Sequence, residues 1–169
     1  MAEKKIGFIG LGTMGGAMCG HLQDAGLPVT VWARSTDKAG AALSAGAAWA
    51  ESPAQLAEMT DVLILCVSND DAVEEIVFGS GGVAAASGQN KVMVDHSSIH
   101  PVTTREWSRK LRDANAMGWI DAPVSGGPGG AARGELIVMA GGDPVDFEQV
   151  RPVISNYAKQ ITLMGPSGS

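Results

Sequence analysis

Short apolar runs alternate with longer stretches of helical periodicity along this chain. The short runs are rich in β-branched residues, as buried strands are, whereas the longer stretches are rich in alanine. We predict strands near residues 4–10, 28–33, 61–67, 91–95, 117–121, 135–140 and 160–164. We predict helices near residues 13–26, 36–45, 53–59, 70–77, 101–115 and 143–156. This alternation predicts an α/β fold: a doubly wound, mostly parallel sheet with right-handed crossovers and additional strands toward its C-terminal end.

Local signals support several of these helix boundaries. Ser52 and Asp143 each precede a proline, and this pair is typical of an N-cap followed by the first helical turn. Gly26 and Gly118 lie where two helices should end, and glycine adopts the left-handed conformation that a helix C-terminus often needs.

The composition fits one globular domain and excludes several function classes. The 169 residues are 45% apolar and carry a net charge of −6, without the basic stripe that nucleic-acid binding or polybasic membrane association requires. The longest apolar run, Val62 to Val67, is six residues long, which is too short to span a membrane. Cys19 and Cys66 lack metal-ligand spacing to any histidine. We therefore expect a reduced, metal-free, cytoplasmic protein.

A glycine-rich motif follows the first predicted strand and opens the first predicted helix. Its residues are Gly10-Leu11-Gly12-Thr13-Met14-Gly15, a Gly-x-Gly-x-x-Gly pattern. In a dinucleotide site the first glycine allows a tight turn, the second lets the backbone approach the pyrophosphate, and the third lets helix and strand pack closely. The helix N-terminus then offers free N–H groups to the phosphates. The alternative is a glycine-rich turn without a ligand; the strand–turn–helix context favours the cofactor.

The end of the second predicted strand indicates which dinucleotide binds. NAD-binding domains usually carry an acidic residue there, which binds the ribose 2′-hydroxyl. This chain has Arg34, Ser35 and Thr36 instead, which can pair with a 2′-phosphate, so we expect NADP(H) to be preferred and NAD(H) to remain possible. Alternatively, Arg34 stacks on adenine or is solvated, and Ser35 or Thr36 caps the next helix. Asp37 would disfavour a phosphate if it faced inward.

Two further blocks complete the pattern: Asp95 to Pro101 (Asp-His-Ser-Ser-Ile-His-Pro) and Asp121 to Gly127 (Asp-Ala-Pro-Val-Ser-Gly-Gly). Together with the glycine motif and Arg34, they make the chain resemble the β-hydroxyacid dehydrogenases, which include 3-hydroxyisobutyrate dehydrogenase and tartronate semialdehyde reductase. The four blocks occur in order over essentially the whole chain. The Asp121–Gly127 block is the most specific of them.

The resemblance implies a role for each strand end. Ser125, Gly126 and Gly127 would hold the carboxylate of a small substrate, and a hydroxyl beside closely approachable N–H donors suits such an anion. Val67, Ser68 and Ser98 would line the nicotinamide side, although residues at strand ends can equally be local caps. His96 lies between Asp95 and Ser97, but consecutive residues in extended chain point to alternate faces. A Ser-His-Asp hydrolase is therefore disfavoured. We interpret His96 as a structural loop residue, and contact with the cofactor or substrate is the alternative.

The resemblance also implies chemistry that this chain does not supply. The family transfers a hydride between nicotinamide and a short hydroxy acid or semialdehyde, and a lysine in an all-helical second domain handles the proton. None of the six lysines stands in that motif, which would lie beyond Ser169. We expect residues 1–164 to form the dinucleotide-binding domain and 165–169 to begin the connection to the absent helical domain.

Alternatives remain at this point. The chain could be a non-enzymatic dinucleotide-binding or interaction module, or a fragment of an imine reductase, which the Asp121–Gly127 block disfavours. Surface left apolar by the missing domain could also drive homo-oligomerisation.

Overall fold

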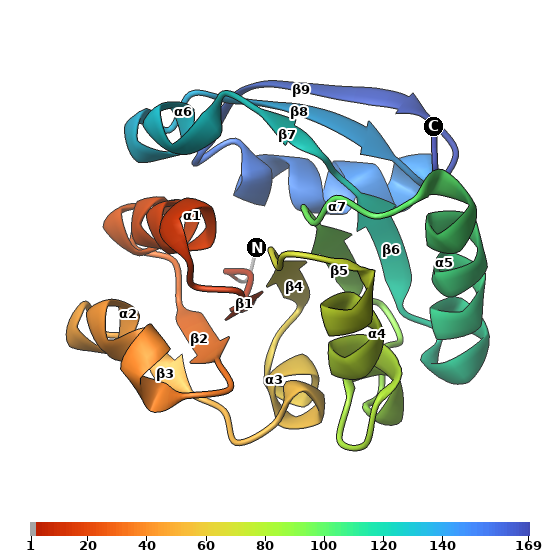
Figure 1. The fold of residues 1–169 in the computed structure, drawn as a ribbon, viewed down its shortest axis with the longest axis horizontal. Coiled ribbons are helices and arrows are strands. Elements are labelled where there is room, and N and C mark those ends of the chain that lie inside the picture. The colour runs from red at the N-terminus through yellow and green to blue at the C-terminus, as the bar shows by residue number, and fades with distance from the viewer. Residues whose placement is uncertain (1–2) are drawn as a thin grey trace.

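Nine strands form one sheet in residues 3–169, the part of the chain that this computed structural model describes (Figure 1). The strands are β1 (Ile6–Ile9), β2 (Val29–Trp32), β3 (Ala48–Trp49), β4 (Val62–Leu65), β5 (Val92–Asp95), β6 (Gly118–Asp121), β7 (Val124–Ser125), β8 (Leu136–Gly141) and β9 (Ala158–Gly165). The first six are parallel and lie in the order β3-β2-β1-β4-β5-β6. This is the strand order of the dinucleotide-binding doubly wound fold, so the predicted fold class is confirmed.

The last three strands extend the sheet beyond β6. Strand β8 runs antiparallel to β6 and β7, and β9 pairs with β8 in parallel. These are the additional strands expected near the C-terminal end of the sequence.

Helices cover both faces of the sheet. They are α1 (Thr13–Asp24), α2 (Gly40–Ser44), α3 (Pro53–Met59), α4 (Asp70–Phe78), α5 (Pro101–Asn115), α6 (Gly127–Arg133) and α7 (Pro144–Ile154), with short 3-10 turns at Thr36–Ala39 and Val83–Ala85. Figure 1 shows α1, α6 and α7 on one side of the sheet and α3, α4 and α5 on the other. Each set packs on its own hydrophobic core, because alternate residues of a strand face opposite sides. Ile64 belongs to the α1–α7 core, for example, and its neighbours Leu63 and Leu65 to the α3–α5 core.

Three short elements escaped the sequence prediction. Strands β3 and β7 contain two residues each, too few to produce a periodic pattern. Helix α6 has the sequence Gly-Pro-Gly-Gly-Ala-Ala-Arg, whose glycines and proline are typical of a turn. The predicted helix over 36–45 divides into the first 3-10 turn and α2.

The predicted caps are confirmed with one exception. The Ser52 hydroxyl accepts a hydrogen bond from the Gln55 N–H, and Gly26 adopts a positive φ of 80° just after α1. The expectation for Gly118 was wrong: Ala116 takes the left-handed conformation after α5. Gly118 instead begins β6, where a Cβ atom would lie 2.3 Å from the Asp146 carboxylate, so close packing explains this glycine.

None of the helices in residues 3–169 is both long and apolar enough to cross a membrane.

Candidate functional site

The glycine motif joins the carboxyl end of β1 to the start of α1. Gly10 has a φ of 99°, and a Cβ atom there would lie 1.9 Å from the carbonyl oxygen of Cys66. A Cβ atom on Gly15 would lie 1.7 Å from the carbonyl oxygen of Gly10. Both positions therefore require glycine, because the loop is pressed against the end of β4 and against α1.

Gly12 differs from these two glycines. It is exposed, its φ of −73° suits any residue, and no atom lies within 4 Å of an added Cβ. It is the N-cap of α1, and no side chain caps the helix there. Open space beside uncapped N–H groups at a helix N-terminus fits a pyrophosphate. Of the neighbouring motif residues, Leu11 and Met14 pack against the core and Thr13 is exposed.

Three polar residues, Arg34, Ser35 and Thr36, follow the end of β2, and Arg34 forms an ion pair. The Arg34 guanidinium lies 2.8 Å from a carboxylate oxygen of Glu75 on α4, and both side chains are largely exposed. Ser35 precedes the first 3-10 turn in extended conformation without capping it through its side chain. The capping alternative for Ser35 therefore does not hold, and its hydroxyl is free for another partner.

Strands β4 and β5 end side by side, and one bond links the segments that follow them. The Val67 N–H donates to the Ser97 hydroxyl at 3.0 Å, which fixes the turn after β4. Ser68 and Ser98 are exposed beside it. Because β1, β4, β5 and β6 are parallel, these residues and the glycine motif lie at the same edge of the sheet.

The Ser125–Gly127 segment begins just beyond the carboxyl end of β6. Ser125 ends β7, which pairs with β8, and it is exposed together with Gly126 and Gly127. The two glycines have φ values of 127° and 61°, which explains why side-chain-bearing residues are absent there. Their N–H groups follow the Ser125 hydroxyl without an intervening side chain.

His96 is a structural residue, as the sequence interpretation expects. Its ring is buried, with Nδ1 2.6 Å from the carbonyl oxygen of Ala122 and Nε2 2.7 Å from the Tyr157 hydroxyl. Since a carbonyl only accepts, Nδ1 donates and Nε2 accepts from Tyr157. Burial lowers the pKa of His96 to about 4, so the ring is neutral near pH 7.

Two ionisable groups at the ends of β4 and β5, Cys66 and Asp95, have raised pKa values. Burial raises the pKa of Asp95 to about 7, opposed by hydrogen bonds from Ser97 and reinforced by the carboxylates of Asp121 and Asp70. One Asp95 oxygen accepts from the Ser97 N–H at 2.9 Å, and the other, buried, has no partner among the described residues. Burial also raises the pKa of the Cys66 thiol to about 11, with a contribution from Asp95. Cys66 is therefore a protonated, unreactive thiol at neutral pH.

Asp121 has a role that its sequence position does not reveal. Its carboxylate accepts from the Gly168 N–H at 3.1 and 3.3 Å, although the two residues are 47 positions apart. The Arg105 guanidinium donates to the Gly168 carbonyl at 3.1 Å. These bonds hold the C-terminal residues beside the start of α5 (Figure 1).

The strand order, the glycine motif and its uncapped helix define the class of this protein: a dinucleotide-binding domain. The family model for the NAD binding domain of 6-phosphogluconate dehydrogenase matches residues 5–165, and the chain belongs to this family. The resemblance inferred from the four sequence blocks is thereby confirmed.

Curated and solved relatives agree with this assignment. The 2-hydroxy-3-oxopropionate reductase of Escherichia coli is 41% identical over 97% of this chain and 56% of its own length. The solved 3-hydroxyisobutyrate dehydrogenase of Mycobacterium tuberculosis, with L-serine, is 31% identical, with a TM-score of 0.90 over 99% of this chain and 56% of its own. A solved protein described as Psf3 in complex with NADP+ and 2-OPP is also 31% identical, with a TM-score of 0.90 over 97% of this chain and 58% of its own. The chain thus spans little more than half the length of these relatives.

Proposed function

We propose that this chain is the NADP(H)-binding domain of an oxidoreductase that acts on a small β-hydroxy acid or semialdehyde. The observation that carries the proposal is the open space beside Gly12, in front of the uncapped N-terminus of α1. It lies at the edge of the sheet where β1, β4 and β5 end. When bound there, the nicotinamide cofactor would donate or accept the hydride. The family match and the NADP+ in one solved relative support this assignment.

Each predicted site residue has a stated task in this proposal. The backbone of the glycine motif binds the pyrophosphate, and Arg34 with the Ser35 and Thr36 hydroxyls binds the 2′-phosphate. Val67, Ser68 and Ser98 orient the nicotinamide. Ser125, Gly126 and Gly127 hold the substrate carboxylate, and their exposed, unobstructed donors support that role.

Turnover needs more than these residues. We propose that residues 1–164 form the cofactor domain and 165–169 begin the connection to a helical domain that supplies the proton-transfer lysine. The bond between Asp121 and Gly168 would then anchor this connection next to the substrate block. A missing general acid lowers rates by roughly 10²–10⁴-fold, so the 169-residue chain should bind cofactor with little or no turnover.

The test is a paired titration of the chain with NADPH and NADH. Binding is measured by fluorescence energy transfer from its four tryptophans to the reduced nicotinamide. We expect NADPH to bind more tightly, and Arg34→Ala to weaken NADPH binding roughly tenfold while leaving NADH binding unchanged, because a charged hydrogen bond to the 2′-phosphate is lost. Glu75→Gln frees Arg34 from its ion pair and should maintain or raise the affinity for NADPH.

Arg133→Ala is the matched control, since Arg133 is exposed on α6 and pairs with Glu135. Equal affinities for the two cofactors, unchanged by Arg34→Ala, would refute the NADP(H) preference. No binding of either cofactor would refute the function proposed for this chain.

A further inference from the structure

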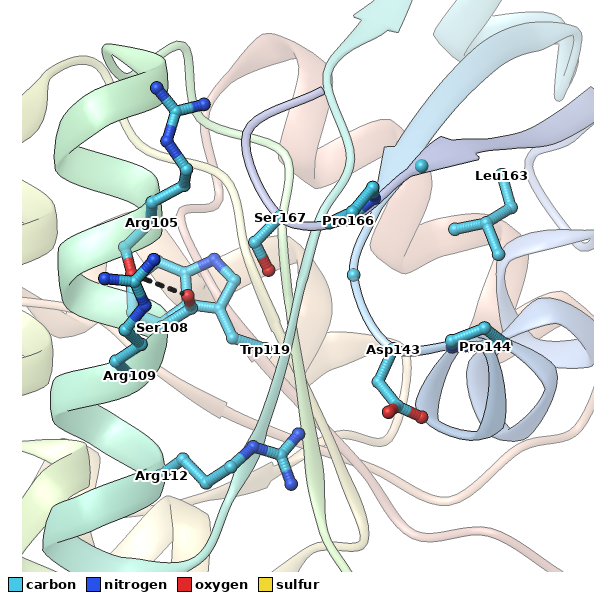
Figure 2. A pocket seen from close by; sticks show the side chains of 12 residues that line it. Arg105, Ser108, Arg109, Arg112, Trp119, Asp143, Pro144, Leu163, Pro166 and Ser167 are labelled. Carbon is cyan, nitrogen blue, oxygen red and sulfur yellow. Dashed lines mark hydrogen bonds between the residues drawn. The ribbon is translucent and has the colours of Figure 1, made fainter.

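A pocket of about 570 Å³ lies between α5 and the β8–β9 end of the sheet. Figure 2 shows side chains of α5 along one wall, with Asp143, Pro144 and Leu163 along the opposite wall. Pockets of this size hold small organic ligands. None of its lining residues belongs to the residues proposed above to bind cofactor or substrate.

Trp119 provides an unpaired donor in this pocket. The residue is 2% exposed, and its Nε1–H has no hydrogen-bond partner among the described residues. A buried N–H without a partner costs about 1–3 kcal/mol, so such groups usually have a ligand or water to satisfy them. Trp119 and Ser167 both line this pocket (Figure 2).

The charges on the α5 wall favour an anion. Arg105, Arg109 and Arg112 lie at helical spacing on this wall, and two of them are engaged: Arg105 with the Gly168 carbonyl and Arg112 with Asp146 at 2.5 Å. Arg109 has no hydrogen bond or ion pair to any residue in 3–169, and Figure 2 shows its side chain extending from α5 on this wall.

The opposite wall carries one acidic side chain, Asp143, against the three arginines of the α5 wall. The Asp143 carboxylate accepts from the N–H groups of Val145 and Asp146 at 2.8 and 3.3 Å, so it caps α7. Leu163, Pro144 and Pro166 make the rest of that wall apolar. The pocket therefore combines a cationic, donor-bearing side with a side that is apolar apart from the Asp143 carboxylate.

We propose that this pocket binds a small organic anion. Its carboxylate or phosphate accepts hydrogen bonds from the Trp119 Nε1–H and the Arg109 guanidinium. Its apolar part packs against Leu163 and the two prolines. The inference does not depend on the cofactor site, because the two sites share no residue.

Nuclear magnetic resonance of the ¹⁵N-labelled 169-residue chain tests this proposal through the four tryptophan indole N–H signals. The Trp119 signal is assigned from its absence in Trp119→Phe. Benzoate and phenyl phosphate serve as anionic probes, and benzyl alcohol is their uncharged counterpart. We expect either anion to shift the Trp119 signal in a saturable manner and leave the other three signals unchanged. The more tightly bound anion identifies the preferred head group.

Arg109→Gln should weaken the binding of the anions about tenfold, as expected for the loss of a charged hydrogen bond. Arg109 is exposed, so this substitution should preserve the fold. Arg133→Gln, which removes an equal charge from α6, should leave binding unchanged. The proposal is overturned if neither anion shifts the signal, if benzyl alcohol shifts it equally, or if Arg109→Gln binds as the unaltered chain does.

Discussion

The glycines of the motif divide into two that the fold requires and one, Gly12, whose space the fold leaves open. Gly10 and Gly15 have no room for a Cβ atom, whereas Gly12 has open space on that side. One sequence pattern predicts all three glycines, but only the structure shows which of them lack room for a side chain.

Gly10→Ala should destabilise the chain strongly, by about 2 kcal/mol or more, because its positive φ is strained for alanine and the Cβ collides with the Cys66 carbonyl. Gly12→Ala should lower the free energy of unfolding by only about 1 kcal/mol, because alanine is a poorer N-cap than glycine. It should weaken NADPH binding roughly tenfold or more, since its methyl group would occupy the phosphate's place. Thermal denaturation and cofactor titration of both variants check this pair. A Gly12→Ala variant with normal affinity for NADPH would contradict pyrophosphate binding beside Gly12.

Asp95 makes the stability of the chain depend on pH. Burial raises its pKa from 3.8 to about 7, so the folded state holds a proton that the unfolded state releases between these values. This group therefore stabilises the fold at low pH, and its contribution is lost as pH rises toward 7. His96 acts in the opposite direction between about pH 4 and 6.5, because its folded-state pKa is lowered.

Asp95→Asn isolates the first of these two effects. The free energy of unfolding of the variant minus that of the unaltered chain should rise with pH by about 1.4 kcal/mol per unit between pH 4 and 7, then stay constant. Taking the difference removes the contribution of His96 and other groups. Urea unfolding at several pH values measures it, and a difference that falls with rising pH would contradict the assignment.

Among the elements, helices with sequence-encoded caps are the most predictable. Helices α3 and α5 have the predicted bounds, because proline marks the start of each and the Ser52 cap precedes α3. Helix α6 and strands β3 and β7 could not be predicted, since their lengths and positions are set by partners distant in sequence.

Ser52→Ala should lower the free energy of unfolding by about 1 kcal/mol, because the Gln55 N–H loses its acceptor at the start of α3. Ser44→Ala is the matched control, as Ser44 is exposed at the end of α2. Chemical denaturation of both variants measures the difference. Equal effects of the two substitutions would show that the cap contributes nothing particular.

At the scale of the whole molecule, the outer face of β8 and β9 leaves apolar side chains in contact with water. Met139 is 37% exposed and Met164 is 58% exposed. We predict self-association through this apolar face.

Sedimentation velocity at increasing concentration should reveal a dimer, and Met164→Glu should weaken its formation at least fivefold. Met59→Glu is the control, because Met59 is similarly exposed, at 40%, but lies at the end of α3. A monomer at all concentrations would rule out this interface.

The sequence by itself determined the order of the longer strands and helices, the glycine motif and the family, because these depend on local periodicity and on residues close together in the chain. It also located the polar groups at the strand ends, since parallel strands bring their carboxyl ends to one edge. Only the tertiary structure decided how distant residues meet: Arg34 with Glu75, His96 with Tyr157, and Asp121 with Gly168. The pocket of Trp119 and Arg109 belongs to the same category. Its donors come from a strand and a helix that acquire a common space only when the sheet forms, so no local pattern could indicate it.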